Sequence, residues 1–161
     1  MKDLMIVILI TVAFVAVIGF IVKLYMDKLT ADGKIVKREG KFFEAEHIFT
    51  VTGIDYNSVE QSLKSLNLRE CGISETYFGN GGRPETLLKS SGGWNALIKF
   101  ENEANGQYVY NFSIPVYSTH NGNAMGIIKM NMLLTSVEKM FLGLDPNTIV
   151  ETKKKNYKYQ K

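Results

Sequence analysis

The chain has 161 residues, of which 45% are hydrophobic and 22% are charged, and its formal net charge at pH 7 is +3. This length leaves room for about one ordinary domain, and the single cysteine, Cys71, excludes an intramolecular disulfide and any multi-cysteine metal site. An apolar run at the N-terminus excludes a wholly soluble protein. No second run is long enough for another span, which excludes a polytopic membrane protein.

The N-terminal run from Leu4 to Val22 holds 19 residues, and 17 of them are apolar. At about 1.5 Å per residue, such a helix spans about 28 Å, close to the roughly 30 Å of a bilayer core. We predict a short tail over residues 1–3 and a transmembrane helix over 4–25. A cleaved signal peptide would need an apolar region of about 7–15 residues and a small-residue cleavage site. The sequence after Val22 has no such site, so we expect an uncleaved single-pass anchor in the cell membrane.

Basic residues follow this helix, and residues 26–41 are interpreted as a basic stem. Only Lys2 precedes the helix, whereas six basic residues follow it: Lys23, Lys28, Lys34, Lys37, Arg38 and Lys41. The positive-inside rule therefore favours a cytoplasmic location for the rest of the chain. The alternative is an extracytoplasmic domain, with the lysines next to the helix reaching whichever interface they meet.

The first half of the remaining chain predicts one strand and one helix. Residues 43–51 alternate between inward apolar and outward polar positions, as a half-buried strand does. Asn57 and Glu60 are spaced as a capping box, which predicts a helix over about 58–67. Residues 68–93 are hard to interpret beyond a possible strand over Ile73–Phe78. An irregular segment of this length is uncommon in a compact domain, so it either contains further elements or is a functional loop.

Two alternating runs, Trp94–Phe100 and Tyr110–Val116, flank Asn105 and Gly106 and predict a β-hairpin. A three-residue loop, 104–106, would place the apolar side chains of both strands on one face, whereas a one-residue slip would expose them. The expected pairs are Phe100 with Tyr110, Ile98 with Phe112, Ala96 with Ile114, and Trp94 with Val116. Pro115 cannot donate a ladder hydrogen bond, so we expect a local bulge or an unpaired stretch there.

The last part of the sequence predicts a third strand of this meander and a final helix. Ile128, Met130 and Met132 alternate after a turn at 121–123. Thr135 and Glu138 form an apparent capping box, and Gly143 stands where a helix-ending glycine would. Ile149 and Val150 suggest a short edge strand. The elements together predict an α+β fold over residues 42–150, in which a three-stranded antiparallel meander and an N-terminal strand form a sheet that two helices cover on one face.

No motif for catalysis, for a cofactor or for a metal is present, so no catalytic or metal-binding residue is assigned. His47 lies on the apolar face of the first strand and is interpreted as a core histidine. His120 is interpreted as a turn residue, and Cys71 as a buried thiol.

The glycine-rich segment after the possible strand at 73–78 is the only candidate binding site in the sequence. Consecutive backbone amides can bind an anion, and an arginine adds a planar bidentate donor. The candidate residues are Asn80, Gly81, Gly82 and Arg83. The competing interpretation is an ordinary glycine-rich turn.

Charge is distributed unevenly along the chain. Residues 151–161 hold five lysines and one acid and are interpreted as a disordered basic tail. This tail could lie on anionic lipid, or it could be a solvated end. Residues 42–150 carry more acidic than basic side chains, which argues against binding of nucleic acid.

The sequence therefore predicts a single-pass membrane protein that presents a small α+β domain as a non-catalytic interaction or accessory module for an unknown protein partner. Two alternatives remain. One is a pilin-like subunit, because pilins also place an apolar N-terminal helix before an antiparallel sheet. The other is a membrane-tethered enzyme.

Overall fold

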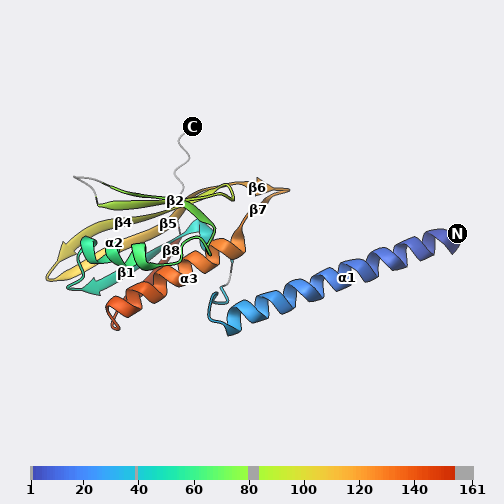
Figure 1. Ribbon diagram of the computed structural model, residues 1–161, viewed down its shortest axis with the longest axis horizontal. Helices are drawn as coiled ribbons and strands as arrows, with labels where there is room; N and C mark the ends of the chain where they lie inside the picture. Colours follow the sequence, from blue (N-terminus) through green and yellow to red (C-terminus); the bar gives the residue numbers. More distant parts are fainter. Residues whose placement is uncertain (1, 39, 80–83, 155–161) are drawn as a thin grey trace. The chain divides into compact units, whose positions relative to one another are not determined.

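The computed structural model describes residues 2–38, 40–79 and 84–154 (Figure 1). The chain divides into two compact units, Met1–Lys37 and Arg38–Lys161. Helix α1 (Lys2–Ala31) forms most of the first unit and is followed by a turn in which Gly33 has a φ of +65°. The helix continues past residue 25, where the transmembrane segment was predicted to end, because residues 26–31 contain no proline or glycine that would interrupt it.

α1 is long and apolar enough to cross a membrane, and it lies near the N-terminus. Its apolar side chains are exposed around the whole circumference of the helix, from Leu4 at 65% to Leu24 at 52%. The only polar side chain in the apolar run Leu4–Val22 is that of Thr11, whose hydroxyl donates a hydrogen bond to the carbonyl oxygen of Val7 at 2.8 Å. Such a bond within the helix leaves no unpaired side-chain donor in an apolar environment.

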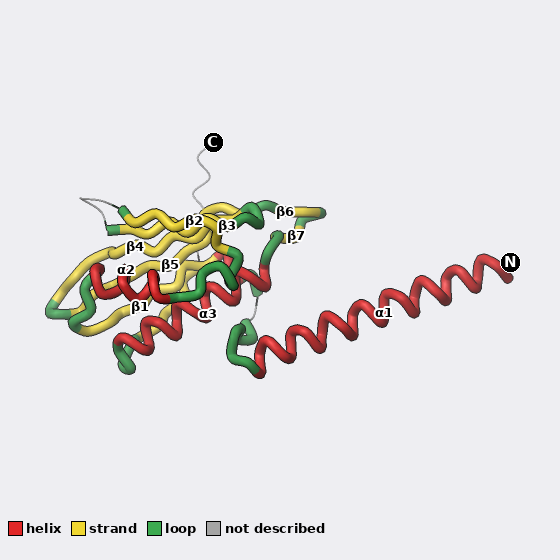
Figure 2. Tube along the Cα trace, in the orientation of Figure 1, coloured by secondary structure: helices red, strands yellow, loops and turns green. Residues whose placement is uncertain are grey.

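The second unit is an α+β domain, as predicted. Its six-stranded antiparallel sheet has the order β2-β3-β4-β5-β1-β8, and β6 and β7 form a separate two-stranded hairpin (Figure 2). The elements are η1 (Phe42–Glu44), β1 (Ala45–Thr52), α2 (Tyr56–Ser65), β2 (Ile73–Phe78), β3 (Glu85–Ser90), β4 (Trp94–Ala104), β5 (Gln107–Tyr117), β6 (Thr119–His120), β7 (Asn123–Ala124), α3 (Ile127–Leu144) and β8 (Ile149–Lys154).

Helices α2 and α3 cover one face of the sheet (Figure 1). Phe141 of α3 stacks on Phe49 of β1, with ring centroids 4.5 Å apart, and lies 5.3 Å from the ring of Tyr110 in β5. Tyr56 of α2 shares a 2.8 Å hydrogen bond with Thr86 of β3. The alternating burial of β1 follows from this arrangement, because every second side chain of the strand faces the helices.

The hairpin of β4 and β5 has the predicted register at its centre but not the predicted loop. Phe100 pairs with Tyr110 and Ile98 with Phe112, as expected. The loop has two residues, Asn105 and Gly106, both with positive φ, which is the type I′ geometry. A register shift between Phe100 and Asn102 shows that β4 holds one extra residue there. The prediction accounts for this residue by a loop of three residues in place of two. The apolar face thus fixes the register, and the bulge reconciles it with the preferred turn.

At the other end of the same hairpin, a bulge is present at Pro115, which is the first of the two expected alternatives. Leu97 pairs with Ser113, whereas Asn95 pairs with Val116, so β5 holds one extra residue in the interval that contains Pro115. Trp94 consequently pairs with Tyr117 and not with Val116 as predicted. Because of this bulge, Pro115 does not occupy a position at which its backbone nitrogen would have to donate a hydrogen bond to β4.

The predicted third strand of the meander and the predicted start of the last helix are both wrong. Residues 127–144 form one helix, α3, which begins after Gly126, a residue with a φ of +78°. Its inward residues have helical spacing throughout: Met130, Leu133, Leu134, Val137, Met140 and Phe141. Thr135 therefore lies inside the helix and caps nothing, and Gly143 precedes the final residue of the helix.

Other boundaries also differ from the prediction. The N-cap of α2 is Asp55, whose carboxylate accepts from the backbone amide of Ser58 at 2.9 Å, so Asn57 lies inside the helix. The segment at 68–93 contains β3 in addition to the predicted β2. The edge strand at Ile149 extends to Lys154, so the first part of the predicted disordered tail is a strand. Residues 155–161 lie outside the described residues.

Candidate functional site

The glycine-rich segment predicted to bind an anion, Asn80, Gly81, Gly82 and Arg83, lies outside the described residues. Its flanks are the ends of β2 and β3, which pair with each other, so the segment connects the two strands of a hairpin at one edge of the sheet. The anion-binding hypothesis stays a prediction.

The other chemically distinctive residues are separated. The thiol of Cys71 is buried and its sulfur lies 3.8 Å from the hydroxyl oxygen of Ser136, not beside a histidine. Burial raises the pKa of this thiol, and a thiol that stays protonated at neutral pH is a poor nucleophile. His120 is exposed in the β6–β7 hairpin, as expected of a turn residue. Within the described ranges, no group of three or more His, Cys, Asp or Glu side chains could hold a metal ion.

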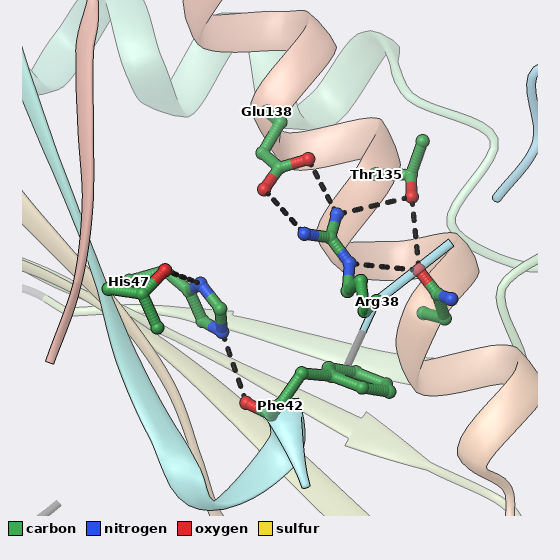
Figure 3. Close-up of polar contacts among 7 residues, drawn as sticks. Arg38, Phe42, His47, Thr135 and Glu138 are labelled. Atoms are coloured by element: carbon green, nitrogen blue, oxygen red, sulfur yellow. Dashed lines mark hydrogen bonds and ion pairs between the residues drawn. The ribbon is translucent and has the colours of Figure 1, made fainter. Parts of the chain in front are cut away.

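A polar cluster forms where the chain enters the second unit, and Arg38 is at its centre (Figure 3). The guanidinium donates to both carboxylate oxygens of Glu138, at 3.0 and 2.5 Å, and its Nε donates to Oδ1 of Asn131 at 3.0 Å. Thr135 completes the set and donates to the same amide oxygen of Asn131 at 3.3 Å. The residues at 131, 135 and 138 share one face of α3 because they are spaced by four and three positions.

The Arg38 cluster is shielded from solvent. The side chains of Arg38 and Glu138 are only 13% and 17% exposed, and the guanidinium carbon lies 5.9 Å from the centroid of the Phe42 ring. A bidentate pair of this kind is both strong and orientationally specific. We infer that the cluster fastens the entering chain to α3.

His47 lies beside this cluster, and its role is structural. It is 3% exposed; Nε2 is 3.1 Å from the carbonyl oxygen of Phe42, and Nδ1 is 3.3 Å from the hydroxyl of Thr152 in β8 (Figure 3). A carbonyl can only accept, so we assign the proton to Nε2, and Nδ1 then accepts from Thr152. Burial lowers the pKa of His47 and Arg38 lowers it further, while the bond to Phe42 opposes them. The interpretation as a core histidine is consistent with this environment.

An open cavity of about 400 Å³ lies at the same end of the domain. Its lining combines residues of η1, the end of β5, the β6–β7 hairpin and the start of α3: Gly40, Lys41, Phe43, Glu44, Tyr117, Thr119, Gly122, Asn123, Ala124 and Ile127. Phe43 and Tyr117 form an edge-to-face pair at 5.1 Å. The cavity therefore has an aromatic wall and a polar rim, as small binding sites in proteins commonly do.

The charged groups at this cavity pair with each other. Lys41 and Glu44 form an ion pair at 3.0 Å, and the hydroxyl of Tyr117 donates to the same Glu44 oxygen at 3.0 Å. The hydrogen bond from Lys41 is the main reason that the pKa of Glu44 is lowered. The carboxylate is thus ionised at neutral pH and already hydrogen-bonded, so it serves recognition better than proton transfer.

Neither the Arg38 cluster nor the cavity was predicted from the sequence. Arg38 was placed in the stem, because nothing near position 38 indicates a long-range partner. A signal did exist in α3, where Asn131 and Thr135 interrupt an apolar stretch at helical spacing. Interpreting residues 128–132 as a strand concealed that spacing.

Comparison with models of protein families finds no family that matches this chain, and comparison with curated proteins finds no matching relative.

Proposed function

We propose that the chain is a single-pass membrane protein that presents its α+β domain as a non-catalytic interaction or accessory module. The observation that carries this proposal is α1, whose apolar side chains are exposed on all sides along a length that matches a bilayer core. A helix that is apolar all round needs either a protein interior or a membrane. Burial of α1 within its own unit does not meet this need, since none of its apolar window is buried.

Two features of the domain support a role in binding. The cavity at the entry of the chain joins an aromatic wall to a polar rim. At the edge of the sheet, β8 exposes Ile149 by 55% and Val150 by 40%, and one side of its backbone faces away from β1. Sheet edges and mixed cavities are common places for a partner to dock.

The contacts of the described residues favour the tethered enzyme less than the interaction module, and the pilin-like alternative can be tested separately. A tethered enzyme would need a nucleophile or carboxylate beside a histidine in a cleft, whereas His47 is buried and bonded to a backbone carbonyl. A pilin-like subunit would share the order of helix and sheet but would require processing of the N-terminus. Mass spectrometry that finds an intact Met1 in the membrane fraction would exclude the pilin-like alternative.

We further propose that the domain is cytoplasmic, because six basic residues follow the apolar run and one precedes it. The anchor and its orientation can be tested together with C-terminal fusions to a fluorescent protein and to alkaline phosphatase in a bacterial host. We expect a fluorescent fusion in the membrane fraction that resists alkaline extraction, and an inactive phosphatase fusion.

The control replaces three side chains in the middle of α1, by Val12→Lys, Val15→Lys and Ile18→Lys. Each lysine at a helix centre costs about 2.5–3.5 kcal/mol of insertion free energy, so the fluorescent fusion should move to the soluble fraction. The matched variant with leucine at the same positions should stay in the membrane. Active phosphatase in the membrane fraction would show that the domain is extracytoplasmic. Recovery of the wild-type protein in the soluble fraction, with α1 cleaved off, would refute the anchor.

A further inference from the structure

The six-stranded sheet ends in two edge strands, β2 and β8, and only β8 is regular. In β2 the pairing with β3 shifts between Ile73 and Glu75. β8 pairs with β1 from Ala45 opposite Lys154 to Thr50 opposite Ile149 without a shift. A bulge protects an edge strand, because it twists the outward backbone groups away from a possible neighbour. β8 is therefore the edge at which a further strand can be added most readily.

The side chains of β8 are exposed on both faces of this edge. Val150, Thr152 and Lys154 stand opposite buried residues of β1, so they lie on the face that the helices cover. Glu151 and Lys153 lie on the other face, where their side chains are 59% and 63% exposed and form an ion pair at 3.6 Å. An exposed pair of this kind contributes little free energy, so either charge can exchange its partner at little cost.

The order of the charges along β8 is complementary to itself. When two copies of one strand pair in an antiparallel arrangement, the two-fold axis passes beside one residue, which then faces its own copy. Residues directly opposite each other share a face of the sheet. An axis at Thr152 places Glu151 of each copy opposite Lys153 of the other, whereas an axis at Glu151 or at Lys153 places like charges opposite each other. No other register of Ile149–Lys154 brings opposite charges face to face.

The same register also suits the side chains on the helix-covered face. Thr152 faces Thr152 of the second copy. Val150, which is 40% exposed, lies opposite Lys154 of the second copy. The aliphatic stem of a lysine can cover an apolar side chain while its ammonium group stays in water. The pairing therefore covers an exposed valine and buries no unpaired charge.

This register also brings together the entry ends of the two domains, where each chain enters its sheet through η1. Ala45 directly follows η1 and pairs with Lys154, two residues from the axis at Thr152. With a rise of about 3.3 Å per residue and about 4.8 Å between strands, the two Ala45 residues would lie about 20 Å apart. Two chains can thus enter such a pair from one membrane.

We propose that two copies of the chain associate by antiparallel pairing of their β8 strands about a two-fold axis at Thr152, which joins their sheets into one. This inference rests on the proposed interaction module and names its partner as a second copy of the chain. Anchoring of both copies by α1 supports so short an interface, because confinement to one membrane raises their effective concentration. A strand of a different protein is the competing occupant of this edge.

The first experiment is cross-linking of the full chain in phosphatidylcholine vesicles, with Cys71→Ser as the background. Directly opposite residues of an antiparallel pair have their Cα atoms about 4.5–5.5 Å apart, a distance that a disulfide can bridge. Mild oxidation of Thr152→Cys should therefore give a disulfide-linked dimer on a non-reducing gel. Glu75→Cys, exposed on the other edge strand, should stay monomeric.

The second experiment leaves Thr152 unchanged and measures energy transfer between donor-labelled and acceptor-labelled chains. The labels are attached at Lys99→Cys on β4, in the same Cys71→Ser background, and would lie about 35 Å apart across the pair. Glu151→Lys or Lys153→Glu alone turns two attractive pairs into repulsive ones. Each variant should lower the association constant about tenfold, or about 1.4 kcal/mol. Glu75→Lys, a matched reversal on the other edge strand, should leave it unchanged.

A mixture of the two variants gives the decisive measurement. Glu151→Lys in one chain and Lys153→Glu in the other restore opposite charges at both positions of a mixed pair. Donor-labelled Glu151→Lys should therefore associate with acceptor-labelled Lys153→Glu about as tightly as two wild-type chains do. Transfer in the mixture that stays as low as in either variant alone would overturn the proposal, because these side chains would then not face each other.

The outcomes separate this inference from the proposed membrane protein. A wild-type chain that fails to float with the vesicles would refute the anchor itself. A chain that floats but shows neither the Thr152→Cys dimer nor energy transfer would refute the self-association alone. In membranes of the expressing cell, a Thr152→Cys adduct of a mass other than that of the dimer would assign the edge to a different protein and would also overturn the proposal.

Discussion

Arg38 is the residue whose role differs most from its prediction. In the sequence it is one of six basic residues after an apolar helix, and it was counted among those that favour a cytoplasmic domain by the positive-inside rule. In the structure its side chain is largely buried against α3, where it forms a bidentate ion pair with Glu138. Sequence reasoning cannot assign such a residue, because its partners lie about a hundred positions away and nothing local depends on them.

We predict that Arg38→Met destabilises the domain by about 3 kcal/mol, because it leaves the carboxylate of Glu138 mostly buried without its partner. The free energy of unfolding can be measured in detergent by urea titration, with the fluorescence of the single, buried Trp94 as the signal. The double variant Arg38→Met with Glu138→Met should regain much of the loss. Additive losses in the double variant would show that the pair is not coupled.

His47 makes the stability of the domain depend on pH. The folded state lowers the pKa of this residue, so the unfolded chain binds the proton more readily. We therefore expect the free energy of unfolding to decrease as pH falls below about 6.5, the ordinary value for histidine, and to be unaffected by this residue above it. Urea midpoints between about pH 5 and 7.5 measure the effect.

His47→Gln is the informative variant, because a glutamine amide can still donate to the Phe42 carbonyl but does not titrate in this range. Its absolute stability can differ from that of the wild type. The prediction concerns the slope with pH, which should flatten between about pH 5 and 6.5. An unchanged slope would assign the acid sensitivity to other groups.

At the scale of elements, α3 depends on a close approach at the residue that immediately precedes it. Gly126 has a φ of +78°, and a β-carbon there would lie 2.7 Å from Nε1 of the buried Trp94. Gly106, in the turn between β4 and β5, has a similar φ of +74° but open space around it. The two glycines therefore separate the cost of backbone strain from the cost of a steric clash.

We predict that Gly106→Ala destabilises the domain by about 1 kcal/mol, through backbone strain alone. Gly126→Ala should cost about 1–3 kcal/mol more, because the indole must also move within a packed core. Thermal unfolding followed by circular dichroism compares the two variants directly. Equal losses would mean that Trp94 moves aside freely.

The elements also show where periodicity is sufficient and where it misleads. The register of β4 and β5 follows from the apolar face, even though the turn was assigned the wrong length. By contrast, Ile128, Met130 and Met132 alternate by chance within a helix, and three residues are too few to distinguish a period of 2 from one of 3.6. β3 was not predicted, because its apolar residues, Leu87 and Leu88, are adjacent and give no alternating pattern.

At the scale of the whole molecule, the sequence was sufficient for the fold class and for the apolar N-terminal helix. Both depend on patterns that extend over many residues, which local errors do not erase. The cavity and the entry end could not be predicted, because they depend on which strands are neighbours. β1 lies between β5 and β8, and that order is set by packing between segments that are far apart in the chain.

This strand order also has a consequence for how the protein is made. Both neighbours of β1 are synthesised long after it, and β8 is the last of the six strands in chain order. The sheet therefore cannot be completed until β8 has left the ribosome. α1, by contrast, is complete as soon as it leaves the ribosome, so delivery to the bilayer can come first and the domain then folds at its destination.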